Sequence, residues 1–390
     1  MNQSTTPPKL INRSEHWPKS TLQGASRDVT FLAKRRGIVS FAMSPNINLI
    51  FMTIFCLSSS GCAGPEFYAQ AVRGHVEVLR NTTSMKDLNM ASLTKIEQKK
   101  INLVIGVRDF AEEQLMLPSN GSFHSYSKLN RQFVVWNVFA TTPLSLAPKN
   151  TCFLVAGCVP YRGFYSKNAA EKYSRKLAKD GFEVYVAGIG AYSTLGWFND
   201  PLLSTVINRS DESLAELIFH ELAHQKIYIK NDAVFNESFA TAIAQEGVRR
   251  WLGLPKTPSQ KRVDEQRKEK ELTTLIINLQ LNIERLYSSG KTLQEKSVLK
   301  KDYFEKLRTD YEALKDSWET DSPYDDYMYE SWNNPKLMAF GAYHQLVPNF
   351  RQLIAEYDGD LSKVYLAVEQ VKNLTNQQRR QRLFPAGKTQ

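Results

Sequence analysis

The sequence has few cysteines and no concentrated basic region, and both absences narrow what the chain can be. Four of its 390 residues are cysteines and no two of them form a CxxC pair, which argues against a cysteine-based zinc site. The net charge is +10, but residues 1–62 carry half of it. Because the remainder shows no basic stripe interleaved with aromatics, we expect no nucleic-acid binding. The hydrophobic content of 42% predicts a folded chain of one or two domains.

The sequence also lacks an apolar run long enough to span a membrane comfortably, and its longest apolar run resembles part of a secretory signal. Residues 47–57 are too short to span a membrane comfortably. They follow the basic residues 34–36 and precede small residues that end at Cys62, which is the order of a secretory signal. The Gly-Cys-Ala ending resembles a bacterial lipobox, which implies lipidation of Cys62 and a lipid anchor in the cell envelope. We treat residues 1–61 as an extension with an export signal; a buried apolar element is the alternative, and Met43 is a possible second start.

The two cysteines outside this region are Cys152 and Cys158. In an oxidising compartment such a pair can form a disulfide. The alternative is two buried thiols in a strand region, and the sequence leaves both open.

Apolar periodicity after residue 62 predicts an α+β fold. We expect helices at 66–83, 93–117 and 169–180, the last stopped by Gly181, and strands at 131–139, 152–159 and 182–194. Further helices are expected at 214–228 and 233–251. Residues 258–320 are rich in Lys, Glu, Gln and Leu and contain no proline after Pro258, which indicates a long helical hairpin broken near 288–291. A tyrosine-rich loop, helices at 335–357 and 361–374 and a frayed basic end follow.

These elements divide the chain into four segments. They are the extension 1–61, a core at 62–255, a charged helical hairpin at 256–322 and a helical region at 323–390 that packs on the core.

The sequence "HELAH" is the feature with the most chemical content. His220 and His224 stand four residues apart, so a helix places both on one face, about 6 Å apart along its axis. Two imidazoles in this arrangement can share one zinc ion, and Glu221 then lies beside the metal as a general base. The alternative is a helix whose histidines face solvent or bond within the core. The apolar residues around the motif favour the metal, because buried histidines and a buried glutamate need a partner.

Counting along the next helix identifies a third ligand. The first helix ends near Tyr228, and Asp232 is a natural N-cap for the second. About one turn into the second helix, Glu237 returns to the level of His224. Two histidines, one glutamate and an open fourth position form a catalytic zinc pattern.

"HELAHQ" followed by "NESFA" resembles the gluzincin metallopeptidases, and the second motif is similar to that of aminopeptidase N. Twelve residues separate His224 from Glu237, which is fewer than is usual in aminopeptidase N or thermolysin. More of the chain resembles a bacterial family of predicted aminopeptidases that are often lipoproteins. That resemblance is carried by "YAQAVRGHVEVL", "VAGCVPYRGF", "AYSTLGWFNDPLLST", "FNESFATA" and "NNPKLMAFGAYHQLVPNF". It implies a zincin-like core with a small mixed sheet beside the "HELAH" helix, and one Zn²⁺ per chain.

The resemblance also suggests roles for residues outside the three ligands. A zincin binds extended substrate along a strand edge, which we assign to Gly188, Gly190 and Ala191, with Asn236 as a further substrate contact. The residue that stabilises the oxyanion is left open among Tyr192, Tyr161, Tyr343 and His344, with Tyr192 and Tyr343 assigned first. Thermolysin-like enzymes carry an Asp where this chain has Thr241, so the partner of the ligand histidines is undetermined.

These features predict a zinc-dependent aminopeptidase of the bacterial cell envelope that uses water activated by Glu221. An aminopeptidase needs an anion for the substrate's α-amino group, and Glu183, Asp200 and Glu246 are candidates. The alternatives are an endopeptidase and a non-catalytic lipoprotein that uses the fold as a binding module. The partners expected are a peptide substrate and, through Cys62, a membrane.

Overall fold

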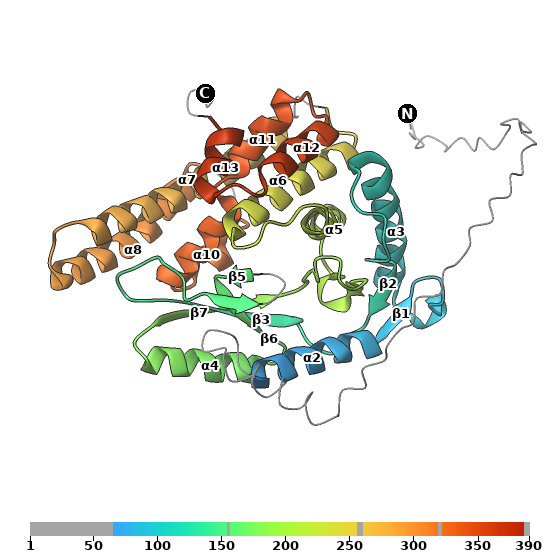
Figure 1. The fold of residues 1–390 in the computed structure, drawn as a ribbon, viewed down its shortest axis with the longest axis horizontal. Helices are drawn as coiled ribbons and strands as arrows, with labels where there is room; N and C mark the ends of the chain where they lie inside the picture. Colours follow the sequence, from blue (N-terminus) through green and yellow to red (C-terminus); the bar gives the residue numbers. More distant parts are fainter. Residues whose placement is uncertain (1–64, 154–156, 256–259, 319–321, 386–390) are drawn as a thin grey trace, which may run out of the picture. The chain divides into compact units, whose positions relative to one another are not determined.

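The computed structural model describes residues 65–153, 157–255, 260–318 and 322–385 (Figure 1). The N-terminal extension, the apolar run of the export signal and Cys62 lie outside the described residues. The first elements are α2 (Pro65–Arg80), β1 (Thr82–Ser84), η1 (Met90–Ser92), α3 (Lys95–Leu115), β2 (Ser125–Ser127), β3 (Val135–Thr141), β4 (Thr151–Phe153), β5 (Gly157–Val159), β6 (Tyr161–Phe164), α4 (Lys167–Lys179), β7 (Glu183–Ile189), β8 (Leu202–Leu203) and η2 (Ser204–Val206).

The remaining elements are helices. They are α5 (Asp211–Lys226), α6 (Ala233–Trp251), α7 (Gln260–Ser288), α8 (Leu293–Asp316), α9 (Asp325–Tyr329), α10 (Asn334–His344), α11 (Val347–Glu356), α12 (Leu361–Val371) and α13 (Asn376–Leu383). The predicted α+β class is confirmed, as is the mainly helical C-terminal region. No helix in the described part of the chain is both long and apolar enough to cross a membrane.

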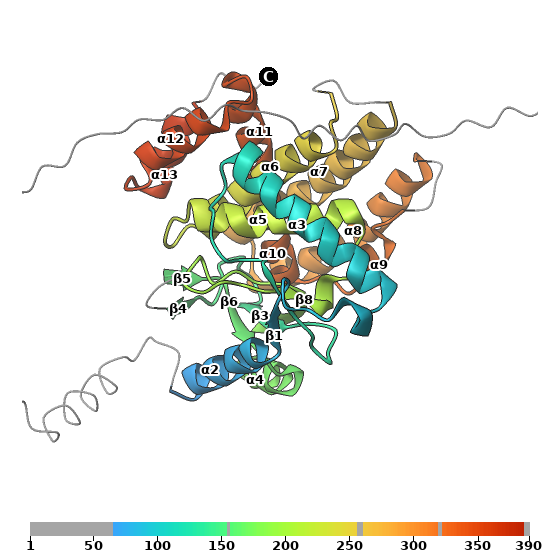
Figure 2. The ribbon, with the colours of Figure 1, turned by 90° about the vertical axis from the view of Figure 1, so that its right-hand side faces the viewer.

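A three-stranded sheet with the order β6-β3-β7 separates two groups of helices. Figures 1 and 2 show α2 and α4 on one side of these strands and α5 and α6 on the other. Alternate residues of β3 serve the two sides: Val138 and Ala140 pack with α2 and α4, whereas Phe139 packs with α10. Both strand pairs in this sheet are antiparallel. The predicted mixed sheet is instead β1-β2-β8, whose β2–β8 pair is parallel and whose Tyr126 and Leu202 share the hydrophobic core with the "HELAH" helix.

The main hydrophobic core lies among the helices. Helices α3, α5, α6, α11 and α12 contribute to one cluster of buried residues, so the C-terminal region shares its core with the N-terminal part of the chain. Gly247 of α6 allows the close approach, because a Cβ there would lie 2.7 Å from both Leu115 and Phe219. Packing of α5 against α3 and α6 thus fixes the helix that carries the "HELAH" motif.

Helices α7 and α8 form the predicted hairpin, which has a core of its own. Thr292 and Glu295 form a capping box where α8 begins. An ion pair between Lys300 and Glu183 ties α8 to the start of β7.

Three expectations about local structure are wrong. The segment expected as one strand at 152–159 contains two antiparallel strands, β4 and β5, and Gly157 supplies the positive φ of 74° at the start of β5. The helix expected at 335–357 is divided into α10 and α11, since Pro348 favours a new first turn. The basic end does not fray as far as expected: residues 376–383 form α13, with Arg379 buried.

Candidate metal centre

Helices α5 and α6 pack against each other and carry the predicted ligands. Ser210 caps the start of α5 by accepting a hydrogen bond from Ser213 N, and Asp232 caps α6 by accepting from Phe235 N. His220 and His224 lie one turn apart on α5, as their spacing predicts. The cap at Asp232 starts α6 soon enough for its second turn to stand beside the two histidines.

The structure brings the three predicted ligands together, and we call His220, His224 and Glu237 the ligand triangle. The two histidine Nε2 atoms are 3.1 Å apart. Oε2 of Glu237 lies 3.3 Å from Nε2 of His220 and 3.4 Å from Nε2 of His224. Three atoms that bind one tetrahedral zinc at about 2.0–2.1 Å stand about 3.3 Å apart. The observed separations therefore fit a tetrahedral metal ion.

A cavity of about 690 Å³ opens at the ligand triangle. All three ligands and Glu221 line it, so a fourth metal ligand can enter from the cavity. The second ring nitrogen of His224, Nδ1, is buried and has no hydrogen-bond partner among the described residues. Thr241 lines the same cavity. The geometry thus provides three converging donor atoms, while Nδ1 of one ligand histidine has no hydrogen-bond partner among the described residues.

Burial and mutual charge shape the ionisation of these groups. Burial raises the pKa of the Glu237 carboxyl, but His224 and His220 outweigh burial, and the net shift is downward. Burial lowers the pKa of His224, but the carboxylates of Glu237 and Glu221 outweigh it, and the net shift is upward. Burial also raises the pKa of Glu221, with the two histidines opposing the shift. The centre therefore concentrates charge that has little solvent to stabilise it.

Two tyrosines face the ligand triangle. Burial raises the pKa of Tyr161, and the carboxylates of Glu237 and Glu221 add to the shift. Burial and Glu237 raise the pKa of Tyr228 to about 12. The sequence reasoning included Tyr161 but missed Tyr228, which lies beyond the end of α5. The helix expected at 214–228 places Tyr228 one turn after His224, and that spacing could have identified it.

The other oxyanion candidates have different surroundings. Tyr192 lines the cavity, but its hydroxyl lies 2.9 Å from His75 Nδ1, and no carboxylate of the centre contributes to its pKa. His344 stacks on Phe340 and is absent from the cavity wall. The side chain of Tyr343 lies outside the described residues.

The predicted substrate strand is an edge of its sheet. β7 pairs with β3 on one side, and Gly188, Gly190 and Ala191 line the cavity. A Cβ on Gly188 would lie 2.4 Å from the Phe133 ring, so glycine at this position makes room for that side chain. The contact of these residues with substrate stays a prediction.

None of the three predicted amine-binding anions lines the cavity. Glu183 forms the ion pair with Lys300, and Glu246 is bonded to Arg249 and Arg250. Asp200 is buried and accepts a hydrogen bond from Thr194 N at 2.8 Å; burial raises its pKa to about 6. The cavity contains another carboxylate, Glu216, which the sequence reasoning did not consider.

Asn236 and the Cys152–Cys158 pair both form hydrogen bonds with the turn between α5 and α6. The amide of Asn236 accepts from Ile229 N at 2.9 Å and donates to Ile229 O at 2.7 Å. Asn236 therefore holds the turn, and it also lines the cavity at the ligand triangle, so its contact with substrate stays a prediction. Cys152 and Cys158 form a disulfide, and Cys158 N donates to the side chain of Asn231 in the same turn.

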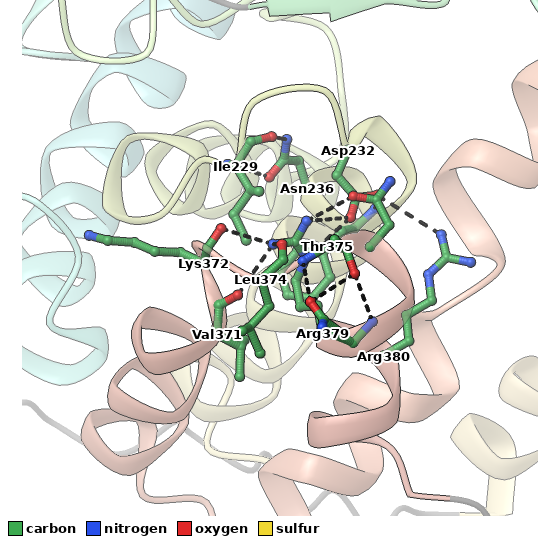
Figure 3. A network of polar contacts seen from close by, with 12 residues as sticks. Ile229, Asp232, Asn236, Val371, Lys372, Leu374, Thr375, Arg379 and Arg380 are labelled. Carbon is green, nitrogen blue, oxygen red and sulfur yellow. Dashed lines mark hydrogen bonds and ion pairs between the residues drawn. The ribbon is translucent and has the colours of Figure 1, made fainter.

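A buried arginine from the end of the chain completes this turn (Figure 3). Nη2 of Arg379 lies 3.1 Å from Oδ2 of Asp232, and both side chains are 2% exposed. The remaining donors of Arg379 reach backbone carbonyls of residues 371, 372 and 374 and the side chain of Asn376. We call Asp232, Asn236 and Arg379 the clamp. It fixes the turn whose length sets the distance between His224 and Glu237.

Comparison with known proteins gives one match. A family model described as "Putative aminopeptidase" matches residues 66–383, which is most of the chain. No curated protein and no solved structure matches.

Proposed function

Because the chain belongs to the family described as "Putative aminopeptidase", we propose that it is a zinc-dependent peptidase that removes N-terminal residues from peptides. The observation that carries the proposal is the ligand triangle. Two imidazole nitrogens and one carboxylate oxygen converge within 4.8 Å of one another at the wall of a cavity. This donor set is the one that catalytic zinc sites use, and the cavity leaves room for substrate.

In the proposed reaction His220, His224 and Glu237 hold the zinc ion. Bound zinc supplies Lewis acidity, which polarises a peptide carbonyl and makes water more acidic. Glu221 takes a proton from the attacking water and passes it to the departing amine nitrogen. Its place next to His220 keeps it at the cavity wall without joining the donor set. The clamp keeps the donor atoms at their separation during the reaction.

Tyr161 is the proposed donor to the carbonyl oxygen as negative charge develops there. Both Glu221 and Glu237 influence its pKa, which locates its hydroxyl near the base and a ligand. No hydrogen bond joins this hydroxyl to another described residue, so it is available to substrate. A donor held at this position stabilises the transition state more than the ground state.

The place of action that we propose is the bacterial cell envelope. The order of basic residues, apolar run and Cys62 supports export and lipid attachment. The Cys152–Cys158 disulfide agrees with an oxidising compartment.

The test compares the zinc-loaded protein with its Glu221→Gln variant on two sets of peptides, one with free N-termini and one blocked and internally quenched. We expect the wild type to release N-terminal residues and the variant to lose activity by about 10²–10⁴-fold. Glu113→Gln, an exposed change on α3 outside the cavity, is the matched control and keeps full activity. Hydrolysis that is unaffected by Glu221→Gln would contradict the enzyme. Cleavage of blocked peptides only at internal bonds would replace the aminopeptidase with an endopeptidase.

A further inference from the structure

The cavity at the ligand triangle contains one carboxylate without a role in the proposed chemistry. The acidic residues in its wall are Glu216, Glu221 and Glu237. Glu237 belongs to the donor set and Glu221 is the proposed base. Glu216 remains, on the same wall and on the same helix as the two histidines.

The position of Glu216 follows from the helix. It precedes His220 by four residues, so the two side chains lie on one face of α5 at levels about 6 Å apart. The charge of His220 influences the pKa of Glu216, which agrees with that proximity. In a bound peptide, the α-amino nitrogen is attached to the carbon next to the scissile carbonyl. An anion one helical turn from a ligand is therefore within reach of that nitrogen.

The surroundings of Glu216 favour a cation. No hydrogen bond or ion pair joins its carboxylate to another described residue. Burial raises its pKa, and Glu269 and Glu212 add to the shift, whereas His220 and Arg209 oppose it. Arg209 lies on the exposed surface and donates to Ser213 Oγ at 3.4 Å. A carboxylate in this setting gains a charge partner when an ammonium group binds.

A second cavity adds further negative charge beside the Glu216 carboxylate. Glu216 also lines a cavity of about 590 Å³, whose wall includes Glu212, Glu265 and Glu269 together with Arg249 and Arg351 among other residues. Negative charge on that side of Glu216 attracts a positive group and repels a carboxylate.

We infer that Glu216 binds the α-ammonium group of the substrate and thereby selects peptides with a free N-terminus. The inference rests on the proposed function and supplies the anion that an aminopeptidase requires. Glu183, Asp200 and Glu246 do not serve, because none of them lines the cavity at the ligand triangle.

The test measures binding and does not depend on turnover. Alanine hydroxamate and N-acetylalanine hydroxamate carry the same zinc-binding group, but only the first has a free amine. Their affinities for the zinc-loaded protein are measured by isothermal titration calorimetry. The variants are Glu216→Gln, which keeps the shape and removes the charge, and Glu113→Gln as the matched control, an exposed glutamate of α3 that lines neither cavity. Zinc content and the thermal transition verify that each variant is folded and loaded.

We expect the wild type to bind the free-amine compound about tenfold or more tightly than the acetylated one. Glu216→Gln reduces that ratio to near unity, and Glu113→Gln preserves it. An equal ratio in wild type and Glu216→Gln would overturn the role of Glu216 while leaving the peptidase intact. If neither compound binds the zinc-loaded wild type, the proposed function fails as well. A loss in Glu216→Gln that is the same for both compounds would assign the carboxylate to another part of the ligand and overturn the inference.

Discussion

The clamp and the ligand triangle lie close together at the start of α6, and they differ in how completely their polar atoms are used. Each side-chain nitrogen of Arg379 has a hydrogen-bond partner: Nε and Nη2 donate to Asp232, and Nη1 donates to backbone carbonyls such as that of Val371. In the ligand triangle, by contrast, Nδ1 of His224 has no partner among the described residues, and three donor atoms face one point. Since buried polar groups are normally satisfied, the contrast separates a group that stabilises the fold from one that awaits a ligand.

The difference has a consequence for stability. Removing one charged member of the clamp should lower the free energy of unfolding, because the charge that remains is buried without a partner. The ligand triangle is costly to bury without a partner, and under the proposed function it would gain stability by binding a metal. Substitutions in the clamp should therefore affect folding first, and substitutions around the triangle should affect metal or catalysis first.

Arg379→Met should have the largest effect on folding. The change leaves the Asp232 carboxylate buried without its guanidinium, so the free energy of unfolding should fall by about 3–5 kcal/mol, as measured by urea denaturation. Arg380→Met is the matched control, because Arg380 is 38% exposed and its Nη2 lies 3.9 Å from Asp232 Oδ1. Its loss should be within about 1 kcal/mol. Equal losses in the two variants would show that the buried Arg379 contributes no more to folding than the more exposed Arg380.

Tyr161→Phe should leave folding nearly unchanged and reduce kcat about 100-fold, since the hydroxyl acts on the transition state. Steady-state kinetics on a free-N-terminus peptide measures this loss, and KM should change little. Tyr228→Phe is the comparison, because Tyr228 also faces the ligand triangle but only Glu237 among the carboxylates influences its pKa. A larger loss of kcat in Tyr228→Phe would transfer the proposed role to Tyr228.

Asn236→Ala should have a smaller effect on folding, and it should also affect metal binding at the ligand triangle. Loss of the two hydrogen bonds to Ile229 should lower the free energy of unfolding by about 1–3 kcal/mol. Because the turn sets the spacing of the ligands, zinc affinity should fall as well, measured by competition with a chromophoric chelator. Asn236→Asp keeps the acceptor for Ile229 N and should retain part of the affinity. Zinc affinity equal to wild type in both variants would show that the turn does not position the ligands.

The comparison also explains which parts of the molecule could be predicted from the sequence. His220, His224 and Glu237 obey local helix geometry, so counting residues along α5 and α6 was enough to bring them together. The bounds of α6, Ala233–Trp251, were likewise correct, since Asp232 is a recognisable cap.

The errors concern contacts between residues that are distant in the sequence. Nothing near Arg379 indicates that it pairs with Asp232, so the basic end was expected to fray. The two hydrogen bonds between Asn236 and Ile229 were likewise not predicted, because they form only when the turn folds. Glu216 was not among the predicted anions, although its position four residues before His220 places both side chains on one face of α5.

Zinc content tests the central claim most directly. The purified wild-type protein, loaded with zinc and passed through a desalting column, is compared with Glu237→Ala and Glu221→Gln by elemental analysis. We predict one zinc ion per chain in the wild type and in Glu221→Gln, and little zinc in Glu237→Ala, because only Glu237 of the two glutamates belongs to the donor set. A wild type without zinc, or equal zinc in wild type and Glu237→Ala, would contradict the metal centre.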